Sequence, residues 1–193
     1  MKKRTAFIGA ILSLIPLGQP FLIKTGLVLS TTGLILSAPE KVYAGDNSYY
    51  FNRAFEKGNK GDHYGAIYDY TKAIEIDSYD SKAYYNRGNS KRKLNDYSGA
   101  ISDYTKAIDI NPNYENAYVN RGISKRNLKD FYGAISDYNK ALEIDPVDKD
   151  SYLNRSISKE KIGDINGACF DAKKAVSLGQ NDPENKNWIM DNC

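Results

Sequence analysis

The sequence has little of what an enzyme needs. It holds one histidine and two cysteines in 193 residues, and no nucleophile–base grouping or glycine-rich phosphate loop occurs in it. His63 stands where similar stretches of the chain have Tyr97 and Phe131, which favours a packing role over a catalytic one. Aspartates and glutamates recur at regular intervals instead of forming a unique cluster. We therefore expect no catalytic residue, no metal site and no cofactor.

The sequence also has no basic surplus beyond its first 44 residues. That segment carries five basic residues and one acidic residue, which leaves 22 basic against 23 acidic residues in the remainder. Binding to nucleic acid depends on many contacts between phosphates and Lys or Arg. The near-neutral remainder therefore argues against nucleic acid as a partner.

Residues 1–44 have a basic start followed by apolar stretches. The run 6–23 is interrupted by two prolines, and a second apolar run, 27–36, precedes the exit VYA. This order is typical of a secretory signal peptide cleaved after Ala44, although such peptides usually have about 15–30 residues. The alternative is an uncleaved membrane anchor, but the prolines break any clean span of about 20 apolar residues. We expect export to a periplasm or lumen, with membrane anchoring as the alternative.

The rest of the chain repeats a stretch of 34 residues. Residues 97–112 are YSGAISDYTKAIDINP, residues 131–146 are FYGAISDYNKALEIDP, and the match extends outward on both sides. A weaker copy precedes these two and a diverged copy follows them. One unit of this size cannot bury its apolar face alone, so the fixed period predicts stacked copies of one unit. The four units are 47–80, 81–114, 115–148 and 149–182, and residues 183–193 remain.

Apolar and small residues within each unit follow a helical period. Numbered from the first residue of a unit, position 4 is tyrosine, position 8 is small, and positions 20 and 27 are alanine. Small residues let two antiparallel helices approach closely, while aromatic residues fill the space beside them. Position 16 is always aspartate, which can cap the second helix. The sequence therefore predicts an all-α chain of helix–turn–helix units.

This pattern resembles the tetratricopeptide repeat, a helix–turn–helix of 34 residues. The resemblance covers residues 47–182 and implies a right-handed superhelical solenoid of about four repeats, which serves as a non-catalytic scaffold for binding proteins. Proline at position 32 departs from the pattern, since it is present only as Pro112 and Pro146. The tyrosine-rich repeats and long leader also resemble exported tetratricopeptide proteins of photosynthetic bacteria, several of which assist the assembly of membrane complexes. A membrane-anchored organiser or assembly factor is therefore the alternative function.

Three charged positions recur in every unit. Position 7 is always arginine and position 11 always lysine, where the family usually has leucine and tyrosine, and position 23 is always aspartate. A repeated arginine and a repeated aspartate most simply form an ion pair within or between units. The alternative is a basic stripe that binds anions.

The inner surface of such a solenoid is lined by the first helix of every unit, so positions 2, 5, 6, 9 and 12 should face a groove. Position 6 is always asparagine, whose amide suits the backbone of an extended peptide. Positions 5 and 9 are mostly apolar, so we expect an apolar or aromatic segment bound at micromolar affinity. The alternative is that these residues pack against each other or a neighbouring chain. The predicted groove residues are Phe51, Asn52, Phe55, Tyr85, Asn86, Asn89, Val119, Asn120, Ile123, Leu153, Asn154 and Ile157.

Some family members use basic residues in this groove to hold the C-terminal carboxylate of a chaperone tail. The corresponding positions of this sequence are Phe51, Asn116 and Asn120. We therefore expect a protein or peptide partner, of unknown identity, that needs no terminal carboxylate.

The last residues have the pattern of a capping helix. Asp182, Pro183 and Glu184 form a helix start, and we expect residues 183–192 to cover the last repeat through Trp188 and Ile189. The only cysteines, Cys169 and Cys193, could form a disulfide that fastens this helix in an oxidising compartment. The sequence favours two unpaired thiols instead, because a terminal residue tends to fray.

Overall fold

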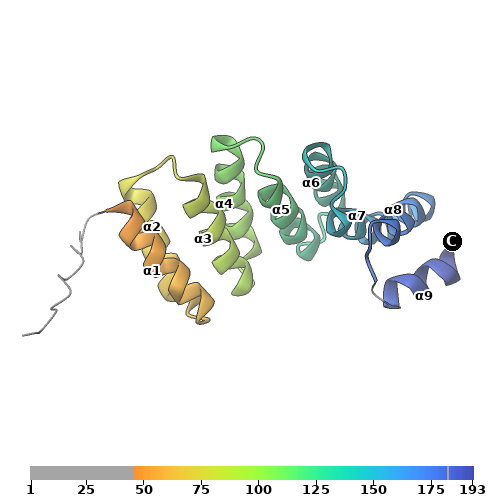
Figure 1. The fold of residues 1–193 in the computed structure, drawn as a ribbon, viewed down its shortest axis with the longest axis horizontal. Coiled ribbons are helices and arrows are strands. Elements are labelled where there is room, and N and C mark those ends of the chain that lie inside the picture. Colours follow the sequence, from red (N-terminus) through yellow and green to blue (C-terminus); the bar gives the residue numbers. More distant parts are fainter. Residues whose placement is uncertain (1–45, 182) are drawn as a thin grey trace, which may run out of the picture. The chain divides into compact units, whose positions relative to one another are not determined.

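The computed structural model describes residues 46–181 and 183–193 (Figure 1). The predicted signal peptide or anchor at 1–44 lies outside these residues. In the described part, no helix is long and apolar enough to cross a membrane. The same part forms nine helices and no strand: α1 Asn47–Asn59, α2 His63–Ile76, α3 Ser81–Lys93, α4 Tyr97–Ile110, α5 Glu115–Asn127, α6 Phe131–Ile144, α7 Lys149–Lys161, α8 Ile165–Ser177 and α9 Pro183–Asn192.

The first eight helices pack in consecutive pairs. α1 packs on α2, α3 on α4, α5 on α6 and α7 on α8, and the second helix of each pair also contacts the first helix of the next pair. The pairs therefore follow one another in chain order, as Figure 1 shows. The all-α solenoid of helix pairs predicted from the 34-residue period is confirmed.

Each second helix starts at a capping aspartate. The side chain of Asp96 accepts a hydrogen bond from the backbone N–H of Gly99 at 2.9 Å, and the other three units repeat this cap. The cap also explains the glycine, because a Cβ at Gly99 would lie 2.1 Å from the Asp96 carboxylate. The capping role predicted for position 16 is thus confirmed at Asp62, Asp96, Asp130 and Asp164.

Small residues set the spacing within each pair. The alanines at positions 20 and 27 are fully buried in all four units. Position 8 faces the tyrosine at position 24, and a Cβ at Gly88 would lie 2.8 Å from the Tyr104 ring. Gly122 and Tyr138 repeat this contact at 2.7 Å. Because glycine has no side chain, the two helices of these units pack more closely than an alanine at position 8 would allow.

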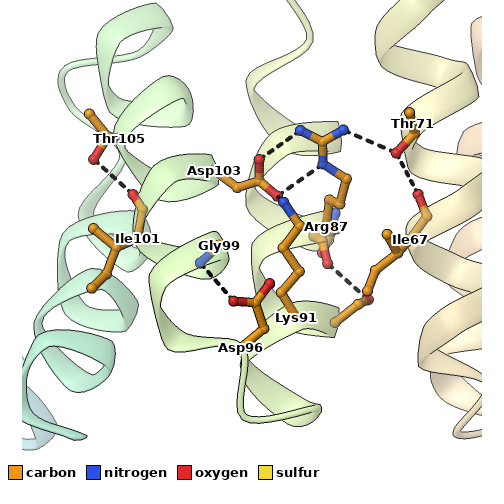
Figure 2. A network of polar contacts seen from close by, with 11 residues as sticks. Ile67, Thr71, Arg87, Lys91, Asp96, Gly99, Ile101, Asp103 and Thr105 are labelled. Atoms are coloured by element: carbon orange, nitrogen blue, oxygen red, sulfur yellow. Dashed lines mark hydrogen bonds and ion pairs between the residues drawn. The ribbon is translucent and has the colours of Figure 1, made fainter. Parts of the chain in front are cut away.

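A buried ion-pair network joins the two helices of every unit. Figure 2 shows the network of the second unit. Arg87 on α3 donates to Asp103 on α4 from Nε at 2.9 Å and from Nη2 at 2.7 Å, and the Nζ of Lys91 lies 2.8 Å from the same carboxylate. The Nη1 of Arg87 donates to the hydroxyl of Thr71 on α2 at 3.0 Å, so the network also reaches the preceding unit. The ion pair predicted for the repeated arginine and aspartate is confirmed, and these cations do not form a free basic stripe. The aspartates of the four networks are Asp69, Asp103, Asp137 and Asp171.

In the first unit, the cations of the network keep the buried carboxylate of Asp69 ionised. Asp69 is fully buried. Burial by itself raises the pKa of this carboxyl, but the hydrogen bonds and charges of Arg53 and Lys57 outweigh burial and lower the pKa of Asp69 below its usual 3.8. Each unit therefore depends on both signs of charge, because removing one partner of a buried pair leaves the other uncompensated.

The helix α9 covers one side of α8 and is fastened at its end. Cys169 on α8 and Cys193 form a disulfide, with their Cα atoms 5.6 Å apart. Trp188 and Ile189 are half-buried in the same helix. The prediction of two unpaired thiols is therefore wrong. The terminal residue does not fray, because it continues the helical hydrogen bonding: the N–H of Cys193 donates to the carbonyl of Ile189 at 2.9 Å. The terminal residue is therefore held against α8.

Asp103→Ala should lower the free energy of unfolding by about 3–5 kcal/mol, because Arg87 and Lys91 would remain partly buried without an anion. Glu143→Ala is the matched control, since it removes the exposed partner of Lys140, 2.6 Å away, and should cost less than about 1 kcal/mol. Urea unfolding followed by circular dichroism measures both variants. Equal losses would show that the buried network contributes no more than a surface pair.

Reducing the disulfide should lower the melting temperature by several degrees, because α9 would then be held by its contacts with α8 alone. Deleting residues 183–193 should lower it at least as much. Thermal melts with and without dithiothreitol measure the effect, and the Cys169→Ser/Cys193→Ser variant, which should not respond to the reductant, is the control. If reduction and deletion both leave the melting temperature unchanged, α9 does not act as a cap.

Candidate functional site

A pocket opens between α1, α2 and α3, where the first helices of two consecutive units lie side by side. Its volume is about 270 Å³. Three of the predicted groove residues line it, one from α1 and two from α3. The wall also contains residues that sequence reasoning did not assign to the groove, among them an imidazole and an ammonium group. The lining residues are Phe55, Gly58, Asn59, His63, Tyr70, Asn86, Asn89, Ser90 and Lys93.

A change at position 12 explains why the pocket lies in the first unit. This position is Gly58 in α1, but Arg92 and Arg126 occupy it in the next two units. A Cβ at Gly58 would have only the Ala66 methyl within 4 Å, at 3.8 Å, so the space beside α1 is left open. The pocket could have been found in the sequence from Gly58, the small residue at a position where the next two repeats have arginine.

His63 contributes a polar group to the pocket wall. The sequence indicates a packing role for it, and it does pack at the start of α2, where it is half-buried. Its Nδ1 is buried and has no hydrogen-bond partner among the described residues. The imidazole therefore keeps one hydrogen-bonding atom that the described part of the fold does not use.

The predicted groove residues of the second and third units form a hydrogen-bond network with each other. The side-chain oxygen of Asn89 accepts from the Tyr104 hydroxyl at 2.8 Å and from the amide of Asn120 at 3.0 Å. The same amide donates to the Tyr85 hydroxyl at 2.9 Å. The Tyr85 ring also lies 4.8 Å from the ring of Tyr114. These contacts hold α3 and α5 together along the predicted groove.

Burial keeps the Tyr104 hydroxyl protonated. The side chain is fully buried, and burial raises the pKa of Tyr104 well above its usual value, although the nearby guanidinium of Arg92 partly opposes this. A protonated hydroxyl is the form that donates to Asn89. The network therefore remains intact across the physiological pH range.

The four asparagines at position 6 are not equivalent. Asn120 uses its amide within the fold, as described above. Among the described residues, no side-chain or backbone group forms a hydrogen bond with the amides of the other three. These three amides are free to bind another molecule: Asn52, Asn86 and Asn154.

The apolar groove residues differ in how far they are exposed. Phe55 has 51% of its surface exposed and borders the pocket, whereas Phe51 packs edge-on against Tyr70 with ring centroids 5.5 Å apart. The structure does not bring the groove residues of the last two units into the pocket. Those residues are half-buried: Val119, Ile123, Leu153 and Ile157.

The described residues contain no group of three or more histidines, cysteines, aspartates or glutamates that could hold a metal ion. The pocket wall likewise has no carboxylate. What the wall offers is an aromatic surface, several amides and one positive charge. Such a surface is suited to binding.

Comparison with known proteins identifies two of the four repeats. Residues 81–114 and 115–148 each match the family model of the tetratricopeptide repeat. No curated protein matches the chain.

Solved structures share the fold. A MamA structure from Desulfovibrio magneticus RS-1 is 17% identical, with a TM-score of 0.71 over 74% of this chain and 81% of that one. The tetratricopeptide domain of Arabidopsis OM64 is 23% identical, with a TM-score of 0.58 over 60% of this chain and 95% of that one. The first such domain of Spaghetti (RPAP3), bound to the HSP90 peptide SRMEEVD, is 27% identical, with a TM-score of 0.57 over 60% and 91% of the two chains.

Proposed function

The chain is a tetratricopeptide repeat protein, and we propose that it is a non-catalytic scaffold that binds an extended, largely apolar segment of a partner protein along its first helices. The observation that carries this proposal is the pocket that joins Phe55 on α1 to Asn86 and Asn89 on α3. Its volume of about 270 Å³ lies just below the range of about 300–1,000 Å³ typical of small-molecule sites. That volume suits one large side chain of a peptide.

The composition of the pocket wall supports this mode of binding. Phe55, His63 and Tyr70 offer aromatic surface to an apolar or aromatic side chain. The amide of Asn86 can donate to a carbonyl and accept from an N–H, the two groups that every residue of an extended peptide presents. A segment could therefore insert one side chain while its backbone is held by the asparagine.

The ligand of a similar structure is informative in one respect. The RPAP3 domain is bound to a peptide of HSP90. At the basic positions of the chaperone-tail clamp, however, this chain has Phe51, Asn116 and Asn120. The proposed ligand therefore needs no free C-terminal carboxylate.

The binding proposal is tested by selecting peptides from a random displayed library on the wild-type chain and measuring their affinity by fluorescence anisotropy. The joint variant Asn86→Ala/Asn120→Ala should bind at least about tenfold more weakly. Asn86→Ala removes a donor and an acceptor for the peptide backbone, each hydrogen bond being worth about 0.5–1.5 kcal/mol, and Asn120→Ala loosens the network beside them. Asn86→Ala alone should weaken binding without changing the melting temperature, whereas Asn120→Ala alone should also destabilise the chain by leaving Asn89 and Tyr85 without its amide.

The control is Asn166→Ala, which changes an exposed asparagine on a second helix, α8. It should leave both affinity and melting unchanged. Undiminished binding by the joint variant, with helicity intact, would show that this surface is not the binding site.

We propose further that the chain is exported and cleaved near Ala44, so that the scaffold acts as a free protein in a periplasm or lumen. The support is the order of basic start, apolar stretches and small-residue exit in residues 1–44. N-terminal sequencing of the protein from its native cells should find a chain that begins near Gly45. A full-length chain in the membrane fraction would favour the alternative, a membrane-anchored organiser of a membrane complex.

A further inference from the structure

Two arginines of the described residues have no acidic partner there. Every arginine at position 7 donates two hydrogen bonds to a buried aspartate of its own unit. Arg92 and Arg126, at position 12 of the second and third units, form no ion pair with any described residue. The repeat therefore supplies an anion for one of its arginines and none for the other.

Both arginines lie on the groove side of their helices. Arg92 follows Tyr85 by seven residues and Asn89 by three, a spacing that places all three on one face of α3. Arg126 stands in the same relation to Val119 and Ile123 on α5. The next residue after Arg92, Lys93, lines the pocket itself.

Each of these arginines also lies beside the buried tyrosine of its own unit. Burial raises the pKa of both tyrosine hydroxyls, and the charge of the neighbouring arginine partly lowers it, Arg92 at Tyr104 and Arg126 at Tyr138. Tyr104 in turn donates to Asn89, so Arg92 borders the network that lines the groove. The two positive charges are therefore next to the proposed peptide site.

One nitrogen of each guanidinium is buried without a hydrogen-bond partner. The Nε of Arg92 and the Nη1 of Arg126 are buried, and no described residue accepts a hydrogen bond from either atom. Burying part of a cation without an acceptor is unfavourable, and buried charges in proteins are normally paired. A ligand cannot reach these buried atoms, but both side chains are only half-buried, so the remaining guanidinium nitrogens can donate to a ligand.

We propose that Arg92 and Arg126 bind carboxylates of acidic side chains in the segment that occupies the groove. This inference rests on the proposed function and specifies its ligand: an apolar or aromatic residue in the pocket, with acidic residues on one side of it. Carboxylate is the natural acceptor, because its two oxygens match the planar donors of a guanidinium. The proposed carboxylate site does not continue into the fourth unit, because position 12 there is Glu160.

The geometry also gives the spacing of the acidic residues. First helices of neighbouring units pack at about 8–10 Å, and an extended peptide advances about 3.3 Å per residue. Carboxylates that reach both arginines should therefore lie about three residues apart. The order along the peptide is fixed as well, because the pocket lies between α1 and α3, Arg92 is on α3 and Arg126 is on α5.

The test uses the full chain and a fluorescein-labelled peptide selected by the wild type from a random library. Peptides selected by the wild type should be enriched in Asp and Glu beyond their anchor residue. Arg92→Gln/Arg126→Gln should weaken binding of such a peptide about tenfold, and replacing the acidic residues of the peptide with Gln should weaken binding to the wild type by the same factor. Both changes together should cost no more than either alone, since they remove the same contacts.

Lys106→Gln/Lys140→Gln is the matched control, because it removes the same charge from exposed lysines on the second helices of the same two units. It should leave the affinity unchanged, which excludes a general effect of net charge. If Arg92→Gln/Arg126→Gln does not fold by circular dichroism, Arg126→Gln alone takes its place with the same expected coupling.

The outcomes separate the two proposals. If selected peptides bind through Asn86 but the protein and peptide changes are additive, or if the selected peptides lack acidic residues, the arginines are not the carboxylate site and the scaffold function stands. If the wild type selects no peptide, the proposed function fails and this inference fails with it.

Discussion

The aspartate at position 23 is the constraint on which the rest of the structure depends. It forms ion pairs with the arginine at position 7 and the lysine at position 11 of the first helix. In the last three units the same arginine also donates a hydrogen bond to a side chain of the preceding unit: Thr71, Thr105 or Asn139. One buried carboxylate thus fixes both the rotation of the first helix and its register against its neighbour. Because positions 7 and 11 point at the partner helix, positions 5, 9 and 12 lie on the opposite face of the first helix, where the groove is predicted.

Some positions on the predicted groove face differ between the repeats. The capping aspartates, the buried alanines and the ion-pair network are the same in all four units, whereas positions 9 and 12 change from unit to unit. Phe55 and Gly58 leave a pocket in the first unit, while Asn89 and Arg92 build a hydrogen-bond network and a positive charge in the second. The interior is therefore the same in every unit, whereas the side chains that a partner would contact differ from one unit to the next.

The sequence was sufficient for the fold because its signals are local and repeated. Each signal restricts the local conformation of the chain over a few residues: the helical period, the capping aspartate such as Asp96, and alanine at two fixed positions. The four copies give the same signals and reinforce one another. It was less informative about the site. The amides of Asn86 and Asn120 are equivalent in the pattern, yet only Asn120 meets the side chains of Tyr85 and Asn89 from the neighbouring unit.

By itself, then, the sequence determined the all-α solenoid and the residues of each helix pair, because these follow from spacing along a helix. The tertiary structure decided which groove side chains are free and which are bonded, that Gly58 opens a pocket, that Arg92 and Arg126 have no acidic partner in the described part, and that Cys193 meets Cys169. Each of these depends on contacts between helices that the chain brings together only when it folds, and a pattern within one repeat contains no information about the distance to the next.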